Sequence, residues 1–283
     1  MIQCDPGPVP HTVVFLHAHP DDEALLTSGT MAKLSAQGHR VVLVVATAGE
    51  AGLSAAALRS DGRLGDRRLA ELDASAAAIG VQRLEVLGYA DSGLASEPTQ
   101  VSLAGPPRFV DADRQEVIRR VAAILEQERA SVLTSYDASG GYGHPDHLAV
   151  HAVAAAAAER AGTPVVLEAT VPRDRLLAAA GAVNRLLPRS RRVDLQPWAH
   201  AYSPAAQITH CIDVRDQARQ RRASMRAHAS QATADSGPRT LGIFTRIPPP
   251  LFGLIFGREW YRQSRPPVIP PAGKRFSGVF DTL

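Results

Sequence analysis

The stretch TVVFLHAHPDDE, residues 12–23, decides the fold of this chain. Its apolar first half predicts a buried strand, and its second half places imidazole and carboxylate groups where that strand ends and a helix begins. A second cluster, His144-Pro145-Asp146-His147, follows another apolar run that contains Val132 and Leu133. Two strand ends of this composition indicate one shared metal site, and a bound metal can make water nucleophilic at neutral pH.

Short β-branched runs alternate with helical patterns over the first two-thirds of the chain. We expect strands at 12–17, 40–46, 83–87, 131–135 and 164–168, and helices at 23–37, 67–78, 115–128 and 146–160. This alternation predicts an α/β, Rossmann-like fold, a mostly parallel sheet with helices on both faces. If the strand order is 3-2-1-4-5, the first and fourth strands are neighbours, and His19 meets His147 at the carboxyl edge where ligands bind.

The bulk composition is that of an ordinary soluble domain. The chain has 283 residues with 45% hydrophobic and 21% charged residues and a formal charge of +3, which suits one large α/β domain or two small ones. We expect a catalytic core over residues 1–170. The pattern weakens beyond it, and residues 171–283 are expected to form a C-terminal extension or small subdomain packed on the core. Within it, 214–232 looks helical and 251–256 favours a buried core element.

Targeting and partner signals are few. Cys4 and Cys211 do not make a disulfide framework, the first ten residues are unlike a signal peptide, and the apolar runs are far too short for a transmembrane segment. We therefore expect a cytoplasmic protein. The arginines lack interleaved aromatic residues, which argues against nucleic acid as a partner. The sequence does not indicate an oligomeric state.

Each cluster taken alone also fits a helix start, because carboxylates and proline are favoured there. Capping requires no histidine, however, so two such places that both add imidazole favour a metal site. Two histidines and one carboxylate leave positions on an ion for water and substrate, and a second carboxylate can deprotonate that water. The adjacent residues Asp21 and Asp22 can supply one carboxylate as a metal ligand and one as a base. The sequence leaves open which of them is the ligand.

The motif AHPDDE at 18–23 together with HPDH at 144–147 resembles the PIG-L/LmbE-like family of zinc-dependent de-N-acetylases. That family includes deacetylases of N-acetylglucosaminyl-phosphatidylinositol and of the mycothiol precursor, and mycothiol-conjugate amidases. Weaker matches are the segments at 47–52, 87–93, 227–231 and 257–260, and the pair Arg68 and Glu71. Arg68 and Glu71 could equally be a surface ion pair at helical spacing.

The resemblance implies a metal site and a sugar site. The implied ligands are His19, Asp22 and His147, for Zn²⁺ or another divalent metal such as Fe²⁺. The implied contacts to an amino-sugar substrate are Glu50, Arg68 and Asp91.

Four further residues are implied as catalytic. Asp21 would be the general base. His144 would stabilise the tetrahedral intermediate or protonate the amine, with Asp146 tuning it. Tyr142, in the glycine-rich turn at 140–143, would polarise the amide carbonyl.

The favoured function is a metal-dependent amidohydrolase that removes the acetyl group of an N-acetylglucosamine-type substrate with zinc-activated water. A mycothiol-conjugate-type amidase is the alternative within the same family. Two alternatives belong to other classes. A non-haem Fe(II) oxygenase also uses two histidines and one carboxylate, and the chain could be a metal-bound sugar-binding module without catalysis.

Overall fold

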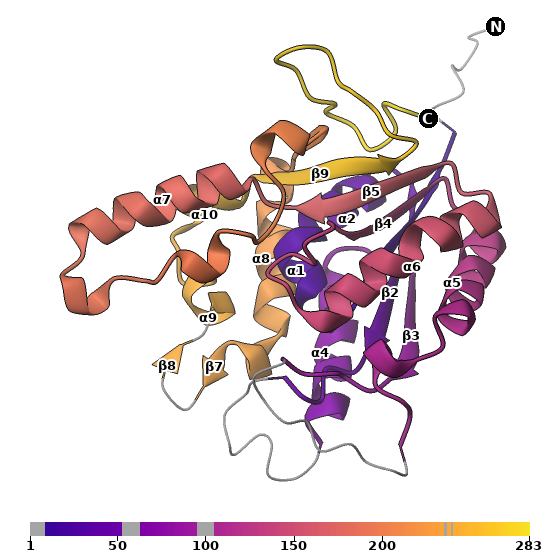
Figure 1. Cartoon of the computed structure of the whole chain (residues 1–283), viewed down its shortest axis with the longest axis horizontal. Coiled ribbons are helices and arrows are strands. Elements are labelled where there is room, and N and C mark those ends of the chain that lie inside the picture. Colours follow the sequence, from indigo (N-terminus) through magenta and orange to yellow (C-terminus); the bar gives the residue numbers. More distant parts are fainter. Residues whose placement is uncertain (1–8, 53–62, 95–104, 235–236, 239) are drawn as a thin grey trace, which may run out of the picture.

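The computed structural model describes residues 9–52, 63–94, 105–234, 237–238 and 240–283, and within them the main feature is one seven-stranded sheet of order β3-β2-β1-β4-β5-β9-β6 (Figure 1). Its strands are β1 Thr12–His17, β2 Arg40–Thr47, β3 Arg83–Tyr89, β4 Val132–Tyr136, β5 Val165–Thr170, β6 His210–Asp213 and β9 Arg258–Arg265. Strands β1 to β5 pair in parallel, and β9 is antiparallel to β5 and β6. The α/β fold class and the order 3-2-1-4-5 are confirmed.

Helices cover both faces of this sheet, as expected. They are α1 Asp22–Leu26, α2 Ser28–Ala36, α4 Leu64–Ala78, α5 Arg114–Glu128, α6 Pro145–Ala161, α7 Arg173–Leu186, α8 Ala218–Ala227, α9 Thr240–Phe244 and α10 Pro249–Phe256. Two short strands, β7 Thr233–Ala234 and β8 Gly237–Pro238, pair in antiparallel orientation. Alternate residues of β1 divide the core, because Val14 packs with α5 and α6 on one face and Val13 with α2 and α4 on the other.

The two motif clusters share one edge because β1 and β4 are direct neighbours. Val13 lies opposite Val132 and Phe15 opposite Thr134, so both strands end together. The backbone NH of Ala18 donates to the Tyr136 hydroxyl at 2.9 Å, which ties the two strand ends to each other. Helices α1 and α6 then start side by side at the carboxyl edge.

Two expectations about helices need correction. The helix expected over 23–37 is broken at Thr27, whose φ of −138° and ψ of −2° leave the helical region. Its hydroxyl lies 2.8 Å from His17 Nε2, so a contact with the strand end replaces helical continuity there. The segment at 251–256 is only half a core element, because Phe252 is 1% exposed and Leu254 is 79% exposed.

Residues 171–283 contribute to the same sheet through β6 and β9. Glu259 on β9 accepts hydrogen bonds from the backbone NH groups of Gly29 (2.9 Å) and Thr30 (2.8 Å) at the start of α2, and pairs with Arg221 of α8 at 2.9 Å. A buried carboxylate thus satisfies the NH groups of a helix start far away in sequence. The division into domains at residue 170 stays a prediction.

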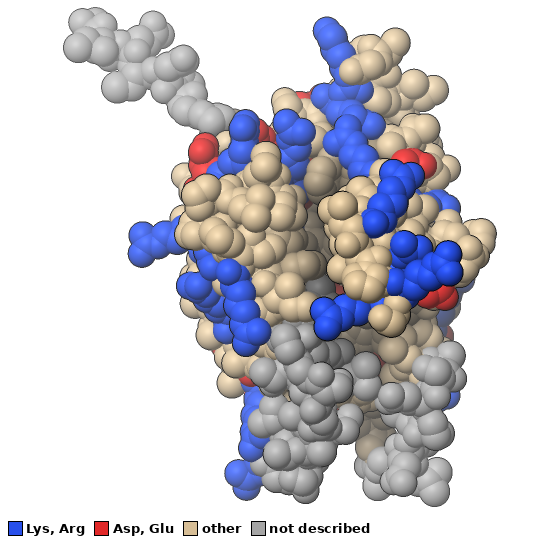
Figure 2. All heavy atoms as spheres, turned by 90° about the vertical axis from the view of Figure 1, so that its left-hand side faces the viewer, with Lys and Arg blue, Asp and Glu red and all other residues tan. Residues whose placement is uncertain are grey.

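The surface of this C-terminal region is strongly basic. Residues 171–283 contain seventeen arginines and one lysine, against six aspartates and one glutamate. Figure 2 shows Lys and Arg side chains spread over the face on the α7 side of the molecule. Such a surface attracts anions at long range. Among the described residues, no helix has the length and apolar character needed to cross a bilayer.

Candidate metal centre and catalytic cleft

The three residues expected as metal ligands meet at one point. Asp22, the first residue of α1, directs Oδ2 to within 3.3 Å of His19 Nδ1 and 3.2 Å of His147 Nε2. His19 follows β1, and His147 lies in the first turn of α6. Burial disfavours the charged form of Asp22, but His147 and His19 outweigh it and hold the pKa of this carboxyl well below its usual range. Asp22 is therefore an anion at neutral pH.

The outer nitrogens of both imidazoles are engaged. His19 Nε2 lies 3.0 Å from Asp146 Oδ2, and His147 Nδ1 lies 3.2 Å from the carbonyl oxygen of Gly140. Each ring therefore turns its other nitrogen toward Asp22, and His147 Nε2 is buried without a hydrogen-bond partner. The lone pairs of an unprotonated imidazole nitrogen and of a carboxylate repel each other unless a metal cation or a proton lies between them. Outer-nitrogen contacts of this kind orient metal-ligating histidines, so the residues fit a divalent metal.

Other groupings of ligand atoms also occur within the described part of the chain. Atoms of His19, His144 and His147 lie within 4.8 Å of one another, as do atoms of His19, Asp91, His144 and Asp146. The second grouping includes Asp146 itself, whose Oδ2 lies 3.0 Å from His19 Nε2, and it leaves out His147. The orientation of the rings favours the set with Asp22.

Asp21 lies beside this centre in a strained conformation. Its φ of 107° is unusual for a residue other than glycine and is held by a hydrogen bond from its backbone NH to Glu23 Oε2 at 2.9 Å. Its carboxylate lies 3.4 Å from Arg68 Nη2. Burial raises the pKa of Asp21 to about 6 although Arg68 opposes the shift. The position therefore presents a basic carboxylate next to the metal centre.

His144 is a neutral hydrogen-bond donor in this arrangement. Its Nδ1 accepts from the backbone NH of Asp146 at 3.1 Å, so the proton of the neutral ring lies on Nε2. Burial, with His19 nearby, lowers the pKa of His144 to about 4. The Asp146 carboxylate contacts His19 and also lies within 4.8 Å of a ring nitrogen of His144. That Asp146 tunes His144 stays a prediction. Tyr142 is 48% exposed, and its ring centre lies 5.1 Å from that of His147.

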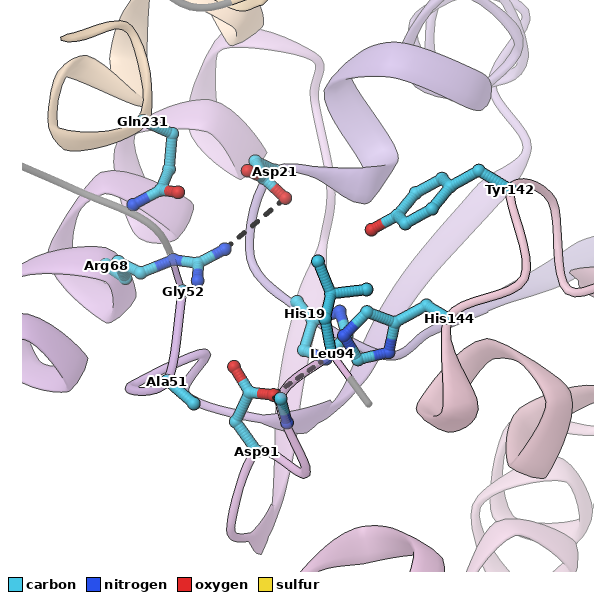
Figure 3. Close-up of a pocket in the computed structure, with 11 residues that line it drawn as sticks. His19, Asp21, Ala51, Gly52, Arg68, Asp91, Leu94, Tyr142, His144 and Gln231 are labelled. Carbon is cyan, nitrogen blue, oxygen red and sulfur yellow. Dashed lines mark hydrogen bonds and ion pairs between the residues drawn. The ribbon is translucent and has the colours of Figure 1, made fainter. Parts of the chain in front are cut away.

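The residues expected to contact sugar differ in their placement. Arg68 and Asp91 line a cavity of about 110 Å³ together with His19, Asp21 and His144 (Figure 3). Arg68 is buried, donates to the carbonyl groups of Gly49 and Pro20, and faces Asp21, so it is not part of a surface pair. Glu50 lies outside the lining and accepts from the backbone NH of Asp91 at 2.8 Å.

A buried polar network behind Asp21 was not predicted from the sequence. Glu23 Oε1 accepts from Ser75 Oγ at 2.6 Å and lies 2.6 Å from His228 Nε2, while its other oxygen holds the backbone of Asp21. Burial opposes this ion pair, yet Glu23 raises the pKa of His228 and His228 lowers that of Glu23. The acidic cluster contained Glu23, but nothing in its spacing indicated a partner 205 residues away.

Two more residues of the site were not expected. Tyr136, the last residue of β4, donates its hydroxyl to Asp22 Oδ2 at 2.6 Å and stacks on His147 with ring centres 4.0 Å apart. Its position directly after an expected strand could have indicated that Tyr136 lies at the site. Gln231 lines the cleft from the C-terminal region, where only its place in a weakly matching segment pointed to the site.

Comparison with known proteins agrees with this geometry. A family model described as GlcNAc-PI de-N-acetylase, PIG-L, matches residues 14–158. A 1D-myo-inositol 2-acetamido-2-deoxy-alpha-D-glucopyranoside deacetylase of Mycobacterium sp. (strain KMS) is 37% identical over 270 residues, covering 89% of this chain and 86% of that protein.

Solved structures of two enzymes share the fold. N,N'-diacetylchitobiose deacetylase from Pyrococcus horikoshii gives a TM-score of 0.55 at 20% identity. The match covers 93% of this chain and 87% of the chitobiose deacetylase chain. The 4-carboxy-2-hydroxymuconate hydratase GalB from Pseudomonas putida gives a TM-score of 0.58 at 15% identity. That match covers 93% of this chain and 100% of the hydratase chain. At these identities the likeness shows the fold alone, and a hydratase and a deacetylase share it.

Together with the family match, the His/Asp cluster at the carboxyl edge of the sheet indicates a metal-dependent hydrolase. The chain belongs to the PIG-L family of de-N-acetylases, because the family model spans half of it and the mycobacterial deacetylase matches most of its length. The predicted family and enzyme class, a hydrolase acting on an amide bond, are confirmed. The mostly parallel sheet also argues against the oxygenase alternative.

Proposed function

We propose that this protein is a zinc-dependent deacetylase that hydrolyses the acetamide of an N-acetylglucosaminyl glycoside to the free amine and acetate. The convergence of His19 Nδ1 and His147 Nε2 on Asp22, with the basic Asp21 beside them, is the observation that supports it most directly. The name of the mycobacterial relative makes a glucosaminyl-inositol the first compound to test.

The metal would be held by His19, Asp22 and His147. When bound, zinc polarises the amide carbonyl and lowers the pKa of a neighbouring water molecule. Three protein ligands leave a coordination position free for water or substrate, as in other catalytic zinc sites. Asp146 and the Gly140 carbonyl keep the two imidazole rings in the orientation that this requires.

The protein side chains would move one proton and stabilise one charge. Asp21 accepts a proton from the attacking water and returns it to the amide nitrogen as the carbon–nitrogen bond breaks. The Nε2–H group of His144 and the hydroxyl of Tyr142 donate to the carbonyl oxygen as it becomes negative. Asp91 and Arg68, which line the cavity, would orient the sugar hydroxyls. Glu50 would act through the backbone of Asp91.

The experiment is an assay of zinc-loaded protein with acetylated glucosaminides, glucosaminyl-inositol first, in which free amine and acetate are both measured. We expect equal amounts of the two products. Asp21→Asn should keep its zinc and lose about 10²- to 10⁴-fold in kcat. Asp73→Asn, an exposed position on α4, is the matched control and should change neither quantity. An active Asp21→Asn protein, or a zinc-loaded protein that releases no amine from any of these compounds, would contradict the proposal. The cytoplasmic location and the lack of nucleic-acid partners stay predictions.

A further inference from the structure

The glycine-rich turn that presents Tyr142 is held by a residue outside the cavity. Tyr142 reaches the cavity from this turn, and its hydroxyl points toward the space between Asp21 and His144 (Figure 3). Asp137, which directly follows β4, is 0% exposed and lies outside the cavity lining. The turn at 138–143 contains three glycines with φ of 60°, 62° and 91°. Glycine adopts such angles without steric penalty but is itself flexible, so the shape of the turn depends on its hydrogen bonds.

Asp137 accepts the hydrogen bonds that shape this turn. Its Oδ1 accepts from the backbone NH groups of Ser139 at 3.1 Å and Gly141 at 3.0 Å. Its carbonyl oxygen accepts from the backbone NH of Gly140 at 2.8 Å. Three consecutive NH groups of the turn therefore bond to one residue. A buried NH group that loses its acceptor costs free energy, so removal of the Asp137 side chain should allow the turn to change shape.

The other carboxylate oxygen of Asp137 connects the turn to β5 and to the C-terminal region. Oδ2 accepts from Thr170 Oγ1 at the end of β5 and from Ser203 Oγ at 3.0 Å. The backbone NH of Ser203 donates to Thr170 Oγ1 at 2.9 Å, which fixes the position of Ser203. The backbone NH of the neighbouring Tyr202 donates to the Gly141 carbonyl at 2.7 Å. The carboxylate therefore joins three separate segments with hydrogen bonds from four donors.

Two groups of the site depend on the shape of this turn. One is Tyr142, the proposed donor to the carbonyl oxygen of the substrate. The other is the carbonyl of Gly140, which lies 3.2 Å from His147 Nδ1 and orients that ring. Catalytic groups act efficiently only when they are held within about 0.5 Å of their productive positions. We infer that Asp137 is a positioning residue that acts on catalysis through Tyr142 and on metal affinity through Gly140. The inference rests on the proposed function for the role of Tyr142.

A double-mutant cycle tests the route through Tyr142. Asp137→Ala should lower the kcat of zinc-loaded protein about 10- to 100-fold, up to the loss expected for Tyr142→Phe, with little change in KM. In a Tyr142→Phe background the same substitution should lower kcat by less than about threefold, because residues that act through one another are not additive. Asp113→Ala is the matched control, since Asp113 also accepts from the backbone NH two residues further along, at 2.9 Å, but caps α5. It should leave kcat unchanged in both backgrounds.

Two milder variants keep the cycle informative. Asp137→Asn retains an oxygen for the NH groups of the turn, so it should recover most of the kcat that Asp137→Ala loses. Ser203→Ala removes one tether and leaves those NH groups bonded. It should show a smaller loss of kcat that also disappears in the Tyr142→Phe background.

Two further measurements require no turnover. The zinc affinity of Asp137→Ala, measured by competition with a chelator, should be roughly tenfold weaker than that of the wild type, because the Gly140 carbonyl no longer orients His147. Amide hydrogen exchange over residues 138–143 should be faster in Asp137→Ala. Asp113→Ala should change neither quantity.

The outcomes separate this inference from the proposed function. Additive losses of kcat in the cycle, or an Asp137→Asn protein as slow as Asp137→Ala, would overturn the inference. A lower thermal midpoint with unchanged kcat, zinc affinity and exchange would show a purely structural role and would overturn it as well. If the wild type releases no amine while zinc affinity and exchange change as expected, the deacetylase proposal alone fails.

Discussion

Replacing Glu259 by glutamine tests how the C-terminal region holds the N-terminal part of the site. The Glu259 side chain is 1% exposed and Arg221, its partner at 2.9 Å, is 4% exposed. The substitution turns an amide NH₂ toward the backbone NH groups of α2 or toward the guanidinium, and it leaves Arg221 as a buried cation without an anion. Breaking a buried pair in this way costs roughly 3 to 5 kcal/mol.

Two features place the expected loss near the lower end of that range. Arg221 keeps hydrogen bonds to the carbonyl groups of Phe256 (2.8 Å) and Leu25 (2.7 Å), which continue to solvate its charge. The glutamine oxygen can still accept one of the two NH groups that begin α2. We therefore expect the free energy of unfolding to fall by about 3 kcal/mol.

The assay is urea unfolding followed by circular dichroism. An equal m-value for the wild type and the variant shows that a shift of the midpoint reports a change in the free energy of unfolding. Asp111→Asn is the matched control, because the Asp111 side chain is 52% exposed and that of its partner Arg108 is 33% exposed. Such an exposed pair is worth at most about 1 kcal/mol. If Glu259→Gln costs no more than Asp111→Asn, the reasoning from burial and pairing is wrong.

Three further predictions concern the site itself. His147→Ala should abolish stoichiometric zinc binding, measured by elemental analysis after dialysis, and full zinc occupancy would remove this residue from the ligand set. Tyr142→Phe should lower kcat by about 10²-fold with zinc content unchanged, because one donor to the developing oxyanion is lost; steady-state kinetics with unaltered kcat would argue that Tyr142 only shapes the cleft. His228→Phe leaves Glu23 as a buried, unpaired carboxylate next to Asp21. We expect the thermal midpoint to fall by several degrees and kcat to be reduced while zinc is retained. A variant with the thermal midpoint and kcat of the wild type would show that the network does not position Asp21.

Much of the site could be predicted from the sequence because its main residues follow parallel strands. The run from Thr12 to His17 specified a buried strand, and the matching run from Ser131 to Ser135 specified another. Since the carboxyl ends of neighbouring parallel strands lie at one edge, an assumed strand order of 3-2-1-4-5 was enough to bring His19 and His147 together. The choice of Asp22 over Asp21 came from the family resemblance. Local pattern was sufficient there because burial, strand direction and helix start are all encoded within about ten residues.

Only the tertiary structure decided what surrounds those residues. Which imidazole nitrogen faces the metal depends on Asp146 and the Gly140 carbonyl, and the conformation of Asp21 depends on Glu23 and, through it, on His228. A cavity of about 240 Å³ beside Asp21 and Asp22 is lined by side chains from four separate segments. Contacts between segments far apart in sequence leave no periodic pattern, because each depends on how whole elements pack and not on the neighbours of a residue along the chain.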